Sequence, residues 1–194
     1  MYGKTEAGLG LPVLVDSSGR LITAAGGGIY ADAAVKGRLF SAANQTPVAT
    51  STTLNTTFTG LGLCNPTGSG KLLVLHEFGY ALDQACAGEA VLALATTTES
   101  GFAADITPRC ARYNYATSVA IVDAGATIDA PVIIKIIATL GQGADTTQLM
   151  PPPTVITLGG SIVIPPGRAV VTDTTVATGA ASIQFHYLWE EIDE

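Results

Sequence analysis

Charged side chains are scarce in this chain, and basic ones are the scarcest. Only 13% of its 194 residues are charged, whereas a typical soluble domain has about 25%. Nine Lys and Arg stand against 16 Asp and Glu, which leaves a net charge of -7. An acidic chain with scattered cations repels a phosphate backbone, so we expect no nucleic-acid partner. The low charge predicts that partner chains, or Thr, Ser and Asn side chains, cover much of the surface.

Cysteine is also rare. Cys64, Cys86 and Cys110 are odd in number and widely spaced, which argues against a disulfide framework and against a zinc site. One intramolecular disulfide stays open as an alternative. We otherwise expect each cysteine to be a buried, reduced thiol, because free cysteine is among the most buried residue types.

Long apolar runs are missing as well. No run approaches the ~18 residues that a membrane-spanning helix requires. The first residues, MYGKTE, lack the basic and apolar regions of a secretory signal. We therefore expect neither membrane association nor export, and synthesis in a cytoplasm. Aromatic residues make up 6% of the chain, so the core should consist mainly of Leu, Ile, Val and Ala.

The motif that comes nearest to enzyme chemistry is a partial phosphate-binding loop at Gly68–Lys71. Such a loop needs a glycine where Asn65 stands and a hydroxyl residue where Leu72 stands. The residues after Lys71 also favour a strand, so no helix N-terminus would meet a phosphate. We therefore expect a glycine-rich hairpin loop here.

Other catalytic patterns are incomplete. His76 opens a zinc-protease motif whose second histidine is replaced by Tyr80. Nothing near Cys64 or Cys110 would activate a thiol beside His76. Carboxylate pairs for a hydrolase would have to be assembled by the fold, from Asp123 with Asp129 or from Asp105 with Asp145. We predict no enzyme, no cofactor and no metal site.

Short apolar segments separated by turn signals fill the chain from residue 46 onward. Eight or nine such strands with few helices are typical of an all-β, jelly-roll-like antiparallel β-sandwich. In the closing strand, Ile183, Phe185, Tyr187 and Trp189 alternate with polar residues and should face the core. The strand candidates are Thr50–Phe58, Leu72–Leu82, Glu89–Thr97, Thr117–Val122, Pro131–Ala138, Thr154–Leu158, Ser161–Ile164, Arg168–Thr172 and Ser182–Trp189. The acidic end, residues 190–194, predicts a solvated terminus or a patch that meets a basic partner.

The first 36 residues differ from the rest and predict an extended N-terminal arm. Strand candidates on either side of the turn Asp16–Gly19 indicate a hairpin. The triple glycine Gly26–Gly28 indicates a hinge, with a tight crossing inside the body as the alternative. A short helix is expected within residues 30–40. The chain then divides into an arm, residues 1–36, and a sandwich body, residues 37–194.

Three segments resemble small jelly-roll structural proteins of tailed-bacteriophage virions. In that family an N-P-x-G-S-G-K loop precedes the first long strand, and a PPG turn and a WEEI-like strand close the fold. The segments are LCNPTGSGKLLVL at residues 63–75, GGSIVIPPG at residues 159–167 and FHYLWEEI at residues 185–192. The N-terminal residues 1–3 and 11–21 also resemble the family, in which this region serves for attachment.

The resemblance implies a capsid decoration (cement) protein at the virion surface. It implies a homo-oligomer, expected to be a trimer, that binds the major capsid protein. The arm would bind by strand addition or in a groove, through the apolar residues Leu11, Val13, Val15, Leu21 and Ile22. The alternative is a receptor- or carbohydrate-binding tail or head-fibre module that uses Tyr113 and Tyr115 beside Arg109 and Arg112. The lack of a long periodic shaft favours the decoration protein.

Overall fold

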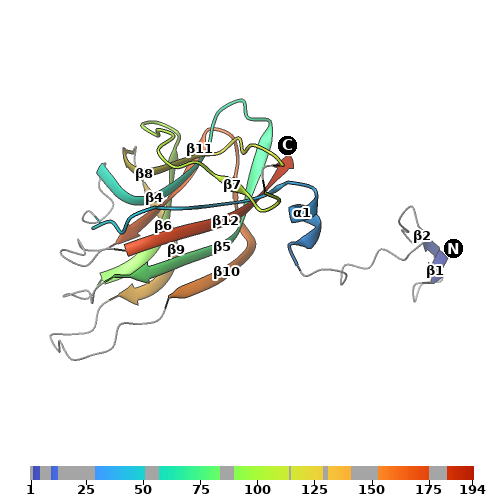
Figure 1. Ribbon diagram of the computed structural model, residues 1–194, viewed down its shortest axis with the longest axis horizontal. Helices are drawn as coiled ribbons and strands as arrows, with labels where there is room; N and C mark the ends of the chain where they lie inside the picture. Colours follow the sequence, from blue (N-terminus) through green and yellow to red (C-terminus); the bar gives the residue numbers. More distant parts are fainter. Residues whose placement is uncertain are drawn as a thin grey trace.

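The structure is a computed structural model that describes residues 2–4, 10–12, 29–50, 57–83, 90–113, 115–128, 131–140, 153–174 and 183–194. Within these residues it contains twelve strands and one five-residue helix. Two antiparallel five-stranded sheets pack face to face as a sandwich (Figure 1). The all-β sandwich that the sequence predicts is therefore confirmed.

The first sheet has the strand order β10-β5-β12-β3-β7, and the second has the order β8-β4-β11-β6-β9. The first comprises Thr154–Ile164, Lys71–Leu82, Ile183–Asp193, Leu39–Ala43 and Arg109–Cys110 in that order. The second comprises Ile121–Thr127, Thr57–Asn65, Arg168–Thr174, Ala90–Thr98 and Val132–Leu140.

The strand order is that of a jelly roll. The chain forms four antiparallel pairs, β3 with β12, β4 with β11, β5 with β10 and β6 with β9. Successive pairs alternate between the two sheets, as they do when one long ribbon wraps around itself. Strand β12 also pairs with β5, and β11 with β6, which joins the pairs into sheets.

One insertion, residues 99–131 between β6 and β9, extends this roll. Its strand β7 adds to the first sheet beside β3, and its strand β8 adds to the second sheet beside β4. The insertion thus closes one margin of the sandwich, and β9 and β10 form the opposite margin. The sequence predicted irregular structure followed by a strand from residue 117. The strand begins later, at Ile121. Its residue Val122 also forms an isolated bridge with Ile106.

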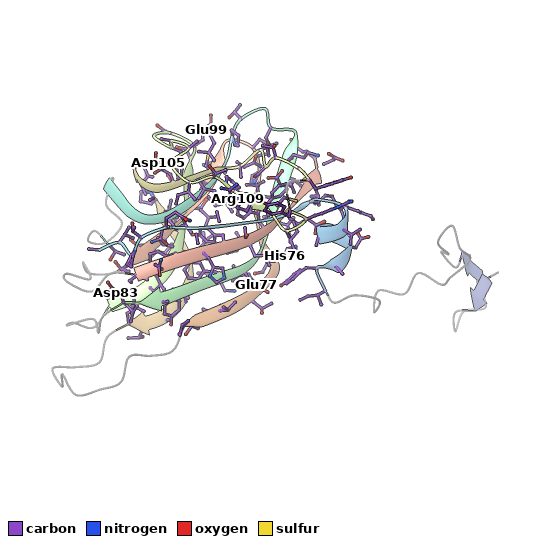
Figure 2. The ribbon with its side chains drawn as sticks, viewed as in Figure 1. His76, Glu77, Asp83, Glu99, Asp105 and Arg109 are labelled. Carbon is purple, nitrogen blue, oxygen red and sulfur yellow. The ribbon has the colours of Figure 1, made fainter. Side chains whose placement is uncertain are left out.

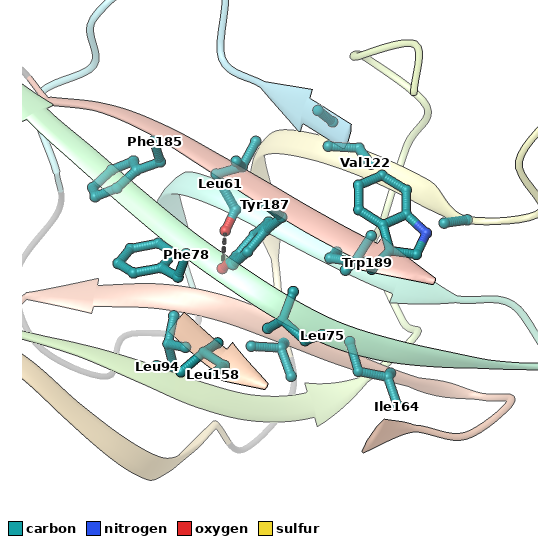
Figure 3. Packing of buried hydrophobic residues seen from close by; sticks show 14 of the residues in the cluster. Leu61, Leu75, Phe78, Leu94, Val122, Leu158, Ile164, Phe185, Tyr187 and Trp189 are labelled. Carbon is teal, nitrogen blue, oxygen red and sulfur yellow. Dashed lines mark hydrogen bonds between the residues drawn. The ribbon is translucent and has the colours of Figure 1, made fainter. Parts of the chain in front are cut away.

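Strand β12 supplies the centre of the core. Its alternate residues Ile183, Phe185, Tyr187 and Trp189 are all buried, as the period-2 pattern predicted. Figure 3 shows the Tyr187 hydroxyl between the sheets, where it donates to the backbone oxygen of Leu61 at 3.1 Å. The surrounding core is mainly aliphatic, with aromatic rings at its largest positions.

Three glycines explain why one predicted strand break is absent and where the helix ends. Gly159 and Gly160 have positive φ, at 58° and 78°, and there the register of β10 against β5 shifts. The bulge bends the strand without ending it, so the two predicted strands are one. The short helix expected within residues 30–40 is α1, Ala31–Val35, and Gly37, at φ 72°, closes it as a left-handed cap.

The first described residues of the arm form a small hairpin. Strands β1, Tyr2–Lys4, and β2, Gly10–Pro12, pair antiparallel, with Gly3 opposite Leu11. Figure 1 shows this hairpin apart from the sandwich. The hairpin expected around residues 16–19 and the hinge expected at residues 26–28 lie outside the described residues. The boundary at residue 36 stays a prediction, although ring contacts with the body already begin at Tyr30.

Candidate functional site

The ionisable side chains that might carry chemistry are spread over the sandwich. Figure 2 shows His76 and Glu77 toward helix α1, Arg109 in the middle, and Glu99 and Asp105 of the insertion at the upper left. In the part of the chain that the structure describes, no three His, Cys, Asp or Glu residues gather as a metal site would require. The candidate functional features of the described chain are therefore turns, clusters of side chains and surfaces.

The partial phosphate-binding loop is a tight turn between β4 and β5. The side chain of Asn65 is buried beneath it, and its Nδ2 donates to the backbone oxygens of Lys71 at 2.7 Å and Ile164 at 2.8 Å. Its Oδ1 accepts from Oγ of Ser69 at 2.6 Å. Strand β5 follows directly, so a strand and not a helix comes after Lys71, as predicted. The predicted hairpin is wrong, because β4 and β5 lie in different sheets and the loop crosses from one sheet to the other.

The three segments that carry the family resemblance meet at this end of the sandwich. The backbone oxygen of Asn65 accepts from the nitrogen of Gly167, in the PPG turn, at 2.8 Å. Strand β12 pairs with the start of β5, with Ile192 opposite Leu72. The Lys71 ammonium forms an ion pair with Asp193. The residues of these three segments thus form contacts that hold two turns and the last strand together.

A second cluster joins the region of helix α1 to the outer face of the first sheet. His76 lies at a bulge in β5, and its ring centroid is 4.9 Å from that of Tyr30. Its Nε2 is 3.4 Å from Oε2 of Glu190, and Glu190 also forms an ion pair with Arg38 at 3.1 Å. Burial, and then the nearby Glu77 carboxylate, raise the pKa of the Tyr30 phenol. The cluster fixes the chain where the arm meets the body.

The acidic end of the chain differs from the prediction of a solvated terminus. Glu190 and Glu191 belong to β12. Glu191 is buried, where it accepts from Oγ of Ser118 and from the backbone nitrogen of Val119 at 3.2 Å. The period-2 pattern of β12 continues past Trp189, which places Glu191 on the inner side of the strand. The insertion supplies the polar partners that make this burial tolerable.

The carboxylate pair that the fold forms differs from the two pairs that the sequence suggested. Asp129 and Asp145 lie outside the described residues, and Asp105 instead faces Asp123. Asp123 is buried and accepts from the backbone nitrogens of Ala103 at 2.7 Å and Gly125 at 2.8 Å. Burial and then Asp105 raise the pKa of Asp123, against the opposite effect of its two amide partners. The contacts of Asp123 join the first part of the insertion to its strand β8.

The thiols and the second histidine occupy structural positions. Cys64 is a buried free thiol, as predicted, and burial, followed by the Glu99 charge, raises its pKa to about 12. A thiol with such a pKa is a poor nucleophile. Cys110 is free and half-buried, and Cys86 lies outside the described residues. The His186 ring covers Gly79, where an added Cβ would lie 1.9 Å from its Cε1.

The residues predicted to bind a partner lie almost wholly outside the described chain. Leu11 belongs to β2, opposite Gly3. Val13, Val15, Leu21 and Ile22 are not among the described residues. Their role in partner binding stays a prediction.

Two shallow grooves lie along the insertion and share Thr107 and Arg109. One, of about 710 Å³, also includes Ser41, Asp105 and His186. The other, of about 690 Å³, contains the two tyrosines of the carbohydrate-binding alternative, Tyr113 and Tyr115.

The two tyrosines differ in their surroundings. Tyr113 is 88% exposed. Tyr115 packs against Gly37 and lies under the Arg112 guanidinium, whose carbon is 3.8 Å from the ring centroid. Tyr115 thus has a packing role, and Tyr113 is the freer binding element.

Most of the exposed large apolar side chains among the described residues lie on the edge strands β9 and β10. Among the described residues, ten large hydrophobic side chains are prominently exposed, and six of them form what we call the apolar ridge. Its members are Val132, Ile133, Ile134, Ile136, Val155 and Val163. The sequence predicted a strand at Pro131–Ala138, but the exposure of this strand depends on its place at the margin of the sheet.

No helix among the described residues is long and apolar enough to cross a membrane. Comparison of the chain with protein-family models, with curated proteins and with solved structures gave no match. A functional hypothesis must therefore rest on the fold, on its surfaces and on the sequence resemblance.

Proposed function

We propose that this chain is a non-enzymatic structural protein of a bacteriophage virion, and that it acts as a capsid decoration (cement) protein. In this proposal the jelly-roll body oligomerises, as a trimer, and the N-terminal arm binds the major capsid protein at the head surface. The observation that carries the proposal is the meeting of the three resembling segments at one end of the roll, through Asn65 and its neighbours.

The hydrogen bonds of the buried polar side chains support a structural role for the protein. Asn65, Asp123 and Glu191 are buried, and each accepts from or donates to backbone atoms of another segment. Their hydrogen-bonding capacity is directed to turns and to the insertion. A binding surface then has to come from exposed strands, from loops or from the arm.

A decoration protein stabilises a shell by covering the junctions between its subunits. A standard protein interface buries ~1,600 Å², so several interfaces for each oligomer add appreciable resistance to rupture. The apolar arm residues Leu11, Val13, Val15, Leu21 and Ile22 suit strand addition, in which backbone hydrogen bonds supply affinity and alternate side chains supply specificity. The low charge of the chain suits extensive burial in such an assembly.

A second candidate, a carbohydrate-binding fibre module, is favoured by one observation. The exposed ring of Tyr113 borders a groove that also contains Arg109 and Thr107. An exposed ring beside polar groups can pack against the apolar face of a sugar while those groups bind its hydroxyls.

Quantitative mass spectrometry of purified virions separates the two candidates. A decoration protein should be present in a copy number of the same order as that of the major capsid protein. A handful of copies for each particle would instead indicate a tail or fibre component. Absence of the chain from purified particles would contradict both candidates.

A further inference from the structure

The apolar ridge lies on two strands that end the two sheets on the same side. Strand β9 pairs with β6, and β10 pairs with β5. Neither has a further neighbour among the described strands. Figure 1 shows both along the lower margin of the sandwich, opposite the margin that the insertion closes. We propose that the apolar ridge is the interface through which copies of this chain associate.

The large exposed fractions of the ridge side chains motivate this inference. Ile136 is 70% exposed, Val132 is 60% exposed and Val155 is 57% exposed. A groove of about 470 Å³ opens between the two strands, where Ile134 faces Val163, and it reaches the core residue Val170. Long hydrophobic edge strands attract further strands unless something covers them. Exposed apolar side chains gathered on edge strands mark interaction sites.

The charge of the ridge favours a second copy over a different partner. Lys135 is the only charged residue in β9 and β10, although the whole chain contains 16 acidic residues. A partner that is recognised by complementary charge would find almost none here. Interfaces of obligate homo-oligomers are the most apolar class and resemble a core cut in half. A second copy supplies the same aliphatic side chains and the same two strands at the margin of the described sheets.

The dimensions of the ridge are sufficient for an association of this kind. Nine residues of β9 at a rise of ~3.3 Å span ~30 Å, and the edges of stacked sheets lie ~10 Å apart. With the side chains included, the strip is about 15 Å wide and covers about 500 Å² on each copy. Two copies would bury about 1,000 Å², which is the lower limit for a specific interface. The inference rests on the oligomer of the proposed function and names its interface, and self-association can be measured without a shell.

The test is the mass of the full chain in solution, measured by sedimentation equilibrium. The double variant Ile136→Lys/Val163→Lys places two charges on the ridge. Val35→Lys is the matched control, because Val35 is 66% exposed but lies on helix α1. The wild type and the control should sediment as oligomers, and the double variant should sediment at the monomer mass of 19.7 kDa. Circular dichroism should be the same for all three proteins.

Should the lysine variant fail to fold, Ile136→Thr/Val163→Thr keeps the β-branched shape and should raise the dissociation constant of the oligomer at least tenfold. A monomeric wild type would overturn the inference, and so would a double variant that keeps the wild-type mass. A monomeric wild type whose binding to virions is lost in the double variant would assign the ridge to a different protein. None of the solution measurements involves a virion, so their failure is distinguishable from failure of the capsid role.

Discussion

At the residue scale, the buried polar side chains connect segments that are distant in the sequence. Asn65 connects the turn after β4 to the end of β10, where it donates to Ile164. Asn44 is also buried, and its Nδ2 donates to the backbone oxygen of Ile183 at 3.1 Å. Each such group satisfies backbone atoms that would otherwise be buried without a partner. These side chains therefore stabilise the roll through single, specific contacts.

We predict that Asn65→Ala lowers the free energy of unfolding by about 3 kcal/mol. The substitution removes the donor to Lys71 and Ile164, and an unsatisfied buried acceptor costs about 1–3 kcal/mol. Urea denaturation of the variant and the wild type measures the difference. Gln45→Ala is the control, since this exposed amide also donates to a backbone oxygen, that of Ala43, at 2.9 Å. The control should cost less than about 0.5 kcal/mol, and equal losses in the two variants would contradict the account.

Residue roles were predictable only where a local pattern carries them. The alternation in β12 places Tyr187 and Trp189 in the core without any knowledge of the fold. The burial of Glu191 was not predictable, because it depends on Ser118 and Val119 in a distant insertion. The pairing of Asp105 with Asp123 likewise requires the bridge that brings Ile106 beside Val122.

At the element scale, the insertion between β6 and β9 is an addition to an otherwise regular roll. Two features hold it in place. Asp123 accepts from the amides of Ala103 and Gly125, which ties the start of the insertion to β8, the strand that pairs with β4. Phe102 packs over Gly62 of β4, where an added Cβ would lie 2.6 Å from the ring. The insertion covers the edges of β3 and β4, which would otherwise be exposed.

We predict that Asp123→Ala loosens the insertion more than it loosens the sandwich. Both amides lose their acceptor, so the amide hydrogens of Ala103 and Gly125 should exchange at least tenfold faster. Amides of the central strand β12 should change little. Hydrogen exchange followed by NMR resolves these positions. Asp123→Asn retains one carbonyl acceptor and should give an intermediate rate. Unchanged exchange at Ala103 would show that the carboxylate does not hold the insertion.

The bounds of a strand were predictable where a turn motif marks its end. The strands around the PPG turn and the long strand after Lys71 are located correctly. Strand β3 was missed because its alanine-rich sequence, LFSAA, follows a helix signal without a turn motif of the usual kind. The break predicted at Gly159-Gly160 is a bulge, since pairing with β5 resumes beyond it.

At the scale of the whole molecule, the protein is a closed roll with one covered margin, one apolar margin and an N-terminal arm. The jelly-roll class was predictable from the number and spacing of strands. The apolar ridge was not, because exposure of β9 and β10 follows from non-local pairing. The proposed role needs two surfaces, one for copies of the chain and one for the capsid.

The most direct test of the proposed role asks whether the arm binds a capsid. In the full-length variant, serine replaces Leu11, Val13, Val15, Leu21 and Ile22. Ile29→Ser is the control, because Ile29 is exposed but lies beyond the arm segment that is altered.

The measurement is co-sedimentation of the purified proteins with virions that lack the chain. Wild type and control should bind at a saturable number of sites, and the arm variant should remain in the supernatant although its circular dichroism matches that of the wild type. Binding of the arm variant with wild-type affinity, or failure of the wild type to bind any particle, would contradict the account.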